Sequence, residues 1–474
     1  MRQAQPTRQW PAYNTIWRWH FYAGLFCIPF VLVLAITGGV YLFKPQVEAA
    51  LNQPYNQLNI AGLPQIASAQ VNAALAAAPN ATLNAYELPL TPQSAVQVLV
   101  SESGELTRIY VHPKTLQILK IEQEDNKLMQ VVHRLHGELL IGSIGSNLVE
   151  LAASWTIVML ITGLYLWWPR HMKGIAGIVY PRLSKGNVGK NNRLLWRDLH
   201  AVTGFWISFF TLFLLLSGLP WAKSWGGLLK EIRHIGTGNV VQQDWTTGRS
   251  ADINSHRNTI FSKINMVSKA DSEHIDHIRH EHMADKVGMH QVMMPQIDYR
   301  PLDRLVTTVK SLNLAPPVLI SPPSKKSPEW TASSKAQNRP LRADLILDGV
   351  SGSVKSRKDF ADRPLLDRII GTGVAIHEGQ LFGWFNQLLG LITAIGLVLL
   401  SVSAIILWWR RRSPGLLGAP QARTEPSYAP LLVASIILLG VLLPFLGISL
   451  IVLLLVERWV LCYIPPAKNF LGLN

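Results

Sequence analysis

Two histidines of this sequence begin the same residue pattern. In each copy a glycine follows the histidine at offset 4, and a hydroxyl residue and a second glycine follow at offsets 17 and 18. Neutral imidazole is a common ligand of iron and other transition metals. A duplicated histidine therefore indicates a duplicated ligand position. The pattern consists of His20, Gly24, Thr37 and Gly38 in the first copy and of His200, Gly204, Ser217 and Gly218 in the second.

A second pair of histidines stands at a fixed distance from two Trp-Trp pairs. His136 precedes the first pair, which begins at Trp167, at an offset of 31, and His377 precedes the second, which begins at Trp408, at the same offset. His133 lies one helical turn before His136 and is the alternative ligand at this place. The alignment with His377 favours His136.

These histidines flank segments that are long and apolar enough to cross a bilayer, which needs about 20 apolar residues per helix. The chain has 474 residues, of which 49% are hydrophobic and 15% charged, and its mean hydropathy of +0.20 is typical of a membrane protein. A fifth apolar region is interrupted by Pro444 and Gly447, so it is either one kinked helix or a tight hairpin of two. The segments are Phe21–Phe43, Leu148–Trp168, Ala201–Trp221, Phe385–Trp409 and, as the fifth, Leu431–Tyr463.

The net charge of +15 is concentrated in short loops beside the apolar segments, a distribution that argues against a nucleic-acid-binding surface. Short basic loops remain in the cytoplasm. This rule places the N-terminus and the loops 169–199 and 410–429 inside, and the segments 44–147 and 222–384 outside. The sequence thus predicts a multi-pass protein of the bacterial inner membrane with a cytoplasmic N-terminus.

The outer segments also resemble one another, because each has a helical run followed by short alternating strands. Both halves begin inside, so the repeats are parallel and related by an axis along the membrane normal. The first segment has a helical run at 66–78 and strands at 95–102, 106–112 and 117–122; the second has a helical run at 302–312 and strands at 343–348 and 353–356.

Parallel duplication places His20 opposite His200, and His136 opposite His377. We call these the inner pair and the outer pair. Facing histidines of a four-helix bundle are the arrangement that two bis-histidine haems require, and Gly24 and Gly204, on the same helix faces as their histidines, leave room for a flat macrocycle. The alternative is that all four are interfacial histidines without a ligand role.

The spacing of the outer pair requires a break in each half. A continuous helix from either histidine to its Trp-Trp pair would cover about 46 Å, more than the bilayer core. We expect the first break in the glycine-rich residues 142–147, and the second at Gly379, Gly383 and Asn386. The outer pair then lies near the outer surface, and upright haem rings would shorten the long electron gap to the inner pair.

A histidine- and methionine-rich stretch in the second outer segment is a separate, weaker candidate. Histidines at three-residue spacing can bind a metal, and the neighbouring methionines would suit copper(I). The alternative is a solvated helix of mixed charge. The histidines concerned are His274, His277, His280 and His282.

The motifs WRWHFYAGL, HRLHGELLIGSIG, WRDLHAVTGFW and IHEGQLFG resemble the PepSY-associated transmembrane family over residues 14–412. Members of that family include inner-membrane ferric-siderophore reductases similar to the ferrioxamine reductase of Gram-negative bacteria. The resemblance implies b-type haem, periplasmic iron reduction and two outer PepSY-like domains. The fold class it suggests is an α-helical integral membrane protein, with duplicated two-helix units around a four-helix haem-binding core, one or two extra C-terminal helices and two small periplasmic α+β domains.

The leading hypothesis is a reductase with two b haems that passes electrons to a ferric siderophore and releases Fe(II). No G-x-G-x-x-G fingerprint follows a strand, so electrons must come from a separate donor, a quinol or a cytoplasmic reductase. The alternatives are a membrane anchor that binds a periplasmic peptidase or wall component, and a metal transporter. Transport is disfavoured because the central portions of the spans lack carboxylates. The siderophore is expected to dock between the two outer domains, where Lys325, Lys326 and Trp330 are candidate contacts or a surface loop without that role.

The expected domain boundaries follow from these segments. They are 1–43 for the N-terminus and first span, 44–132 for the first outer domain, 133–168 for the outer histidine segment and second span, 169–199 for the basic loop, 200–221 for the third span, 222–376 for the second outer domain, 377–409 for the outer histidine segment and fourth span, 410–429 for an inner loop and 430–474 for the C-terminal helix or hairpin.

Overall fold

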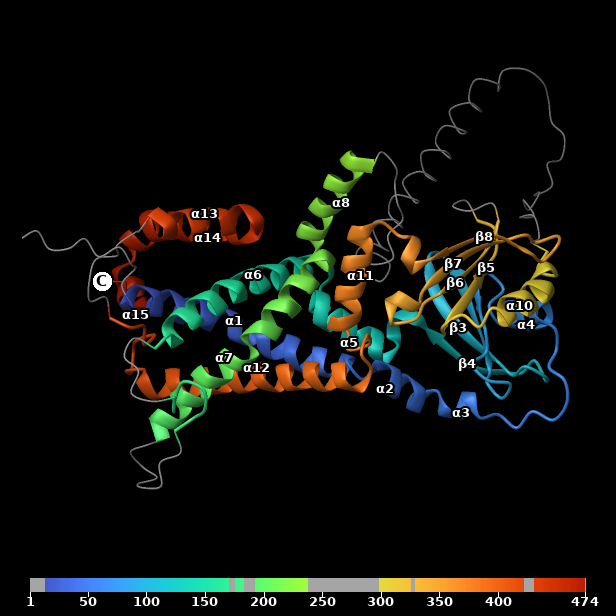
Figure 1. The fold of residues 1–474 in the computed structure, drawn as a ribbon, viewed down its shortest axis with the longest axis horizontal. Coiled ribbons are helices and arrows are strands. Elements are labelled where there is room, and N and C mark those ends of the chain that lie inside the picture. Colours follow the sequence, from blue (N-terminus) through green and yellow to red (C-terminus); the bar gives the residue numbers. More distant parts are fainter. Residues whose placement is uncertain are drawn as a thin grey trace, which may run out of the picture. The chain divides into compact units, whose positions relative to one another are not determined.

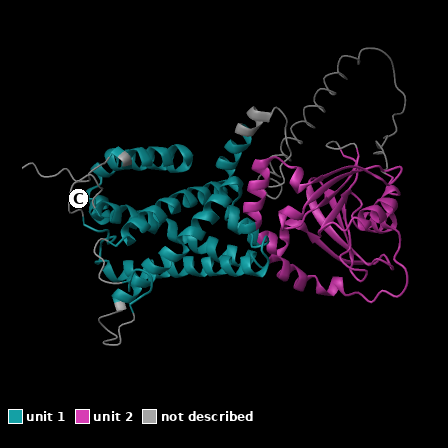
Figure 2. Cartoon of the chain, in the orientation of Figure 1, with its two compact units in different colours: residues 1–43, 132–242, 376–474 teal, residues 44–131, 243–375 magenta. Residues whose placement is uncertain are grey.

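The computed structural model describes residues 13–169, 175–182, 192–237, 298–324, 329–421 and 430–473. The chain divides into two compact units, coloured separately in Figure 2. We call residues 1–43, 132–242 and 376–474 the helical unit, and residues 44–131 and 243–375 the sheet unit.

Four long apolar helices make up the centre of the helical unit (Figure 1). Neighbours in contact are α1 with α6, α6 with α7, α7 with α12, and α12 with α1, so the four close into a ring. The 29 residues of α1 cover about 43 Å at the rise of an α-helix, enough to cross a bilayer. The predicted spans are therefore confirmed as helices. The bounds are α1 Tyr13–Tyr41, α6 Gly142–Trp167, α7 Asn192–Gly218 continued by η2 Leu219–Trp221, and α12 Trp384–Arg411.

Each half carries a short helix that is separated from the following span by a sharp turn. In the first half α5, Leu128–Glu138, precedes α6, and in the second half α11, Leu365–His377, precedes α12. The second break lies where the sequence predicted it, with Gly379 and Gly383 at φ of 74° and 61°.

The first break begins earlier than the sequence predicted. It begins at Leu139 and Leu140, which adopt φ of 51° and 60°, and ends at Gly142, the first residue of α6, which adopts φ of 62°; residues 143–147 continue that helix. The predicted site is therefore correct at Gly142, where the turn ends, and wrong for the residues after it, because the second glycine serves a different purpose. Gly145 lies directly against the carbonyl oxygen of Glu138, and a side chain at this position would overlap that atom.

The C-terminal apolar region is a hairpin, which decides between the two alternatives left by the sequence. Helix α13, Pro430–Leu442, turns at Leu443 into α14, Pro444–Trp459, and the backbones of Gly440 and Gly447 meet at the turn. Helix α14 packs on α6, and the indole of Trp155 donates a hydrogen bond of 3.0 Å to Ser449.

The two ends of this hairpin return to the end of the bundle where α1 begins. The Arg18 guanidinium donates hydrogen bonds to the carbonyl oxygens of Pro420, before the hairpin, and Gly472, after it. The Tyr22 hydroxyl donates to the carbonyl of Leu471, in the helix α15 (Pro465–Leu471) that follows the 3-10 turn η5 (Leu461–Tyr463).

The sheet unit contains the predicted helical runs and strands of both halves. Each half contributes one helix and one four-stranded antiparallel meander. The first half supplies α4 Ala67–Ala77, β1 Thr82–Glu87, β2 Val96–Glu102, β3 Glu105–Val111 and β4 Ile118–Gln123. The second half supplies α10 Pro301–Ser311, β5 Val318–Ser321, β6 Trp330–Ser334, β7 Ala343–Leu347 and β8 Val354–Asp359. The remaining short elements of the sheet unit are α2 Lys44–Leu51, α3 Gln53–Asn56, η1 Glu124–Asn126, η3 Arg339–Leu341 and η4 Phe360–Asp362, whereas α8, Lys223–Thr237, belongs to the helical unit.

The two outer segments form one sheet rather than the two small domains that the sequence suggested. The strand order is β4-β3-β2-β1-β5-β6-β7-β8, and the halves join where Tyr86 and Glu87 of β1 pair with Ile320 and Leu319 of β5. An isolated four-stranded half would leave these strands as unpaired edges. The partner half supplies the missing hydrogen bonds, so the halves complete one another.

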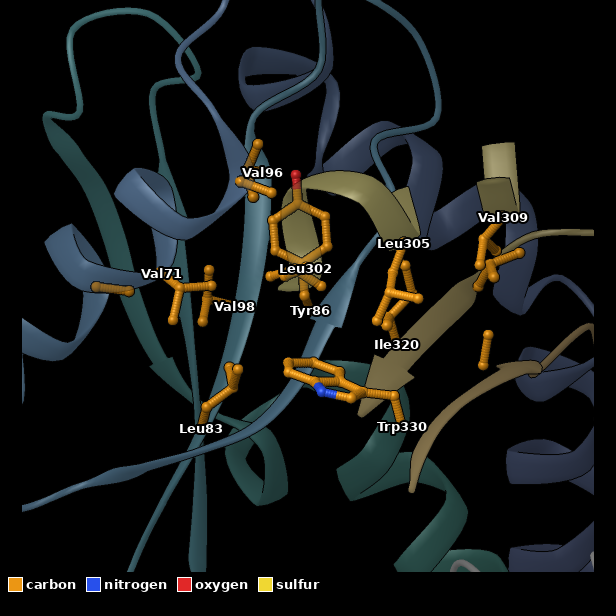
Figure 3. Packing of buried hydrophobic residues seen from close by; sticks show 14 of the residues in the cluster. Val71, Leu83, Tyr86, Val96, Val98, Leu302, Leu305, Val309, Ile320 and Trp330 are labelled. Carbon is orange, nitrogen blue, oxygen red and sulfur yellow. The ribbon is translucent and has the colours of Figure 1, made fainter. Parts of the chain in front are cut away.

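The halves of the sheet also share one hydrophobic core (Figure 3). Val71 of α4 and Leu305 of α10 both belong to it, and the Asp303 carboxylate accepts hydrogen bonds of 2.7 and 2.8 Å from the backbone and hydroxyl of Ser68. The described halves are therefore not two separate domains, and the expected docking place between two outer domains is corrected to that extent. Trp330 is only 5% exposed and belongs to this core, so it is not a surface contact.

The α5–α6 turn yields a stability prediction. Gly145→Ala should lower the free energy of unfolding by about 1–3 kcal/mol, because the new methyl group must displace the Glu138 carbonyl. The measurement is the thermal unfolding midpoint of the detergent-solubilised protein. Gly137→Ala is the matched control, since its methyl group would meet no atom within 4 Å. Equal midpoints for the two variants would contradict the assigned packing.

Candidate functional site

The structure brings the inner pair together inside the helical bundle. His20 lies in the third turn of α1 and His200 in the third turn of α7. Their ring centroids are 6.3 Å apart and the ring planes are inclined by 80°. Two residues from different halves of the chain thus face one another, as the duplication predicts.

The outer pair has nearly the same geometry. His136 lies in the last turn of α5 and His377 is the last residue of α11. Their centroids are 6.4 Å apart and the planes are inclined by 82°. The two halves therefore build two equivalent sites, and each site takes one histidine from each half.

The spacing of both pairs fits a shared metal centre. A bond of about 2.0 Å from a metal to each imidazole nitrogen, together with about 1.1 Å from that nitrogen to the ring centre, puts two collinear ligand rings roughly 6.2 Å apart. The observed separations are 6.3 and 6.4 Å. The described residues contain no group of three or more His, Cys, Asp or Glu side chains that could hold a metal ion. A metal at either pair would therefore need its remaining ligands from elsewhere, as a porphyrin supplies them.

The Nδ1 atom of every paired histidine lies within hydrogen-bond distance of a helix hydroxyl. In the inner pair the partners are Thr162 at 3.0 Å for His20 and Ser403 at 3.1 Å for His200. In the outer pair they are Thr37 at 3.0 Å for His136 and Ser217 at 2.9 Å for His377. Each hydroxyl comes from the same half of the chain as its histidine.

Sequence reasoning missed this role of the hydroxyls. Thr37 and Ser217 belonged to the repeated pattern without an assigned purpose, and Thr162 and Ser403 did not stand out. The signal was present, because Thr162 precedes Trp167 at the same offset at which Ser403 precedes Trp408. Aligning the halves on those tryptophans would have found both hydroxyls.

A glycine follows three of the four hydroxyl residues and lets the imidazole lie close to the helix backbone. A methyl group on Gly38 would come within 3.1 Å of the Cε1 atom of His136, and one on Gly163 within 3.2 Å of that of His20. At Gly218 the corresponding distance to His377 is 3.6 Å. The fourth position is Ala404.

The two glycines predicted to make room for a macrocycle differ in their surroundings. A methyl group on Gly24 would meet nothing within 4 Å, so this face of α1 borders open space. A methyl group on Gly204 would lie 3.5 Å from Leu400, an ordinary packing contact. A larger group therefore has room at Gly24, whereas Leu400 already packs at Gly204.

His133, the alternative outer ligand, lies beside the outer pair. Its ring packs against Tyr41, with centroids 5.4 Å apart, and against Trp221 at 6.1 Å. The ring that stacks edge-on against His377 is that of His136. The geometry therefore favours His136 as the partner of His377.

A basic side chain lies near the inner pair. The guanidinium carbon of Arg411 is 4.9 Å from the ring centre of Phe21, the residue after His20, and 5.1 Å from that of Trp17. The Nε atom of Arg411 is buried and has no hydrogen-bond partner among the described residues. A carboxylate of a bound group, such as a haem propionate, is the kind of partner that this cation would accept.

The two pairs lie at opposite ends of the bundle. Helix α1 carries His20 near its start and Thr37, the partner of His136, near its end. At 1.5 Å per residue, the stretch of helix between these two positions covers about 25 Å. This length is most of the thickness of a bilayer's hydrocarbon core, which is about 30 Å.

Some candidates fall outside the described residues. The histidines of the His/Met-rich stretch and two lysines proposed as siderophore contacts belong to this group, and their prediction stays as the sequence made it. These residues are His274, His277, His280, His282, Lys325 and Lys326.

A model of the family described as the PepSY-associated TM region matches residues 17–411. The match includes both histidine pairs and all four hydroxyl residues. No curated protein matches the chain.

The pairing predicts which substitutions act alike. If the pairs bind haem, His20→Ala and His200→Ala should each remove the same haem, and His136→Ala and His377→Ala the other, because no covalent bond would retain it. The ratio of haem to protein in the purified variants should fall from two to one.

His133→Ala is the matched control and should leave both haems bound. Loss of the outer haem in this variant, with retention in His136→Ala, would transfer the ligand role to His133.

Proposed function

The chain belongs to the PepSY-associated TM family, and from this premise we propose that it is a di-haem b reductase that passes electrons across the bacterial inner membrane to a ferric siderophore in the periplasm. The observation that carries the proposal is the pair of equivalent bis-histidine sites, one at each end of a membrane-spanning bundle.

The histidines would hold two haems. When bound, haem supplies a one-electron centre whose potential depends on its axial ligands and on the polarity around it. The four helices hold the ligand pairs about 25 Å apart along the bundle and surround them with apolar side chains. Arg411, with its unpaired Nε, would balance the negative charge of an inner propionate.

The direction of electron flow rests on the distribution of charge. Basic loops at the ends of α6 and α12 favour a cytoplasmic position for the inner pair. The pairing of β1 with β5 supports the same topology, since it requires the segments after α1 and after α7 to lie on one side of the membrane. The sheet unit and the outer pair would then face the periplasm.

The proposed reaction moves one electron at a time. A quinol or a cytoplasmic reductase gives an electron to the inner site, and ferric iron in the siderophore takes one from the outer site and becomes Fe(II). Siderophore oxygens bind the lower charge less tightly, so reduction releases the iron. The chain itself would supply ligand geometry and insulation from water rather than acid–base chemistry.

A second candidate is a membrane anchor that binds a periplasmic peptidase or wall component without redox activity. The sheet favours it in one respect, because β4 and β8 are its terminal strands and an extended peptide could pair with either. The four hydroxyl contacts to paired histidines have no purpose in that function. Haem content separates the two candidates.

The purified protein should be red and should show the low-spin spectrum of bis-histidine b haem, with bands that sharpen on reduction by dithionite. Paired imidazoles and the absence of a C-x-x-C-H attachment motif lead to this expectation. The measurement is the absorption spectrum after expression in haem-replete cells. A colourless preparation would exclude the reductase and leave the anchor.

The sidedness of the reaction can be tested with a membrane-impermeant ferric chelate. Right-side-out spheroplasts and inverted vesicles are prepared with pre-reduced haem, and reoxidation is followed optically after addition of the chelate. Prompt reoxidation is expected in the spheroplasts only. The His377→Ala variant is the control and should remain reduced, because it lacks the outer site. Prompt reoxidation confined to the inverted vesicles would overturn the proposed direction.

A further inference from the structure

The hydroxyl groups beside the paired histidines have a fixed hydrogen-bonding role. Each belongs to a helical Thr or Ser whose Oγ also lies against a carbonyl oxygen of the preceding turn. Thr37 donates to Val33 at 2.6 Å, Thr162 to Val158 at 2.8 Å and Ser217 to Phe213 at 2.7 Å. Ser403 donates to Leu400 at 2.9 Å.

A hydroxyl group has one proton to donate. A carbonyl oxygen can only accept, so at these distances the proton must lie between the hydroxyl and the carbonyl. The hydroxyl oxygen then faces the histidine with a lone pair. The hydrogen bond between Nδ1 and the hydroxyl therefore requires a proton on Nδ1.

The backbone strengthens this requirement. The carbonyl of Leu400 lies 3.2 Å from the Nδ1 atom of His200 and is a second acceptor there. The carbonyls of Leu34, Met159 and Leu214 lie 3.4, 3.1 and 3.2 Å from the hydroxyl oxygens of Thr37, Thr162 and Ser217, as second acceptors for those hydroxyl protons. In all four cases the residue is three positions before the hydroxyl. Every hydroxyl proton is thus held by backbone carbonyls, which leaves the hydroxyl oxygen to accept from Nδ1.

We infer that Thr37, Thr162, Ser217 and Ser403 are positioning residues that hold each imidazole as its Nδ1-protonated tautomer, with the Nε2 lone pair free for the metal, and that they lower the reduction potential of the bound haem. The second part rests on the proposed function, whereas the first concerns the protein alone. The partner of the non-ligating nitrogen fixes the tautomer and raises the basicity of the ligand. A more basic ligand stabilises ferric iron, which is why the potential falls.

The chain offers a matched set of substitutions. Thr37→Val and Thr162→Val keep the shape of the side chain and remove the acceptor, one at each haem, and Thr37→Ser and Thr162→Ser keep the hydroxyl. Thr393→Val is the control, because Thr393 is buried in α12 and donates to the carbonyl of Leu389 at 2.8 Å but makes no hydrogen bond to a histidine.

The first readout is a spectroelectrochemical titration of the full-length protein. Each Val variant should raise the reduction potential of the haem whose histidine loses its hydroxyl partner. We expect a rise of about 59 mV, which is a tenfold change in the ratio of reduced to oxidised haem for a one-electron couple. Each Val variant should also weaken haem binding by about 10- to 100-fold. The Ser variants and Thr393→Val should match the wild type. Unchanged potentials and haem affinities in both Val variants would overturn the tuning role.

The second readout does not depend on haem. Nitrogen-15 NMR of histidine in the full-length chain, purified from haem-depleted cells and placed in nanodiscs, reports the tautomer. The signals of His20 and His136 are assigned as those that disappear in His20→Ala and His136→Ala. In the wild type both should show protonated Nδ1. The His20 signal should lose this signature in Thr162→Val, and the His136 signal should lose it in Thr37→Val. Protonated Nε2 in the wild type would overturn the inference, whether or not the protein binds haem. A wild-type protein that shows protonated Nδ1 but never binds haem would instead exclude the proposed function.

Discussion

An imidazole among apolar helices must satisfy both of its ring nitrogens, because an unpaired polar group in hydrocarbon is costly. In this protein one nitrogen of each of four histidines meets a hydroxyl group of a neighbouring helix, and each ring faces a second histidine. The hydroxyls are themselves satisfied by helix carbonyls. The other nitrogen of each ring still requires a partner, and this requirement connects the packing of the bundle with its proposed chemistry.

The turns between the short and long helices serve the same arrangement. Because α5 and α11 leave the direction of the following spans, His136 and His377 approach the bundle from its end and reach Thr37 and Ser217 on α1 and α7. A continuous helix would carry these histidines far beyond the bilayer. The first turn also requires a glycine at position 145, because α6 lies directly against the Glu138 carbonyl there.

Much of this organisation could be predicted from the sequence, because duplication makes weak signals visible twice. The pairing of His20 with His200 and of His136 with His377 came from repeated spacing. The spans came from the length of the apolar segments, and the need for a break before α6 came from the length that a continuous helix would cover. The predicted place was correct only at Gly142, since the sequence does not distinguish a glycine that permits a turn, as Gly142 does, from one that permits a close contact, as Gly145 does. The joining of β1 to β5 was missed because it depends on residues far apart in the chain, such as Tyr86 and Ile320, and neither strand carries a local mark of its partner. The sequence left the C-terminal region open between one kinked helix and a hairpin, because the contacts of α13 with α14 and of α14 with α6 are not marked by local composition.

Each histidine pair takes one member from each half of the chain, and the central strand pair of the sheet does the same. A single half, expressed alone, would therefore have two ligand histidines without their partners, and β1 or β5 would become an additional open edge of its sheet. Two copies of it could complete both sites only as an isologous dimer, with the metal positions on the two-fold axis. The covalent joining of the halves removes the concentration dependence of that assembly. Covalent joining also allows equivalent positions of the two halves to carry different residues. Thr162 and Ser403, which occupy equivalent positions, already differ.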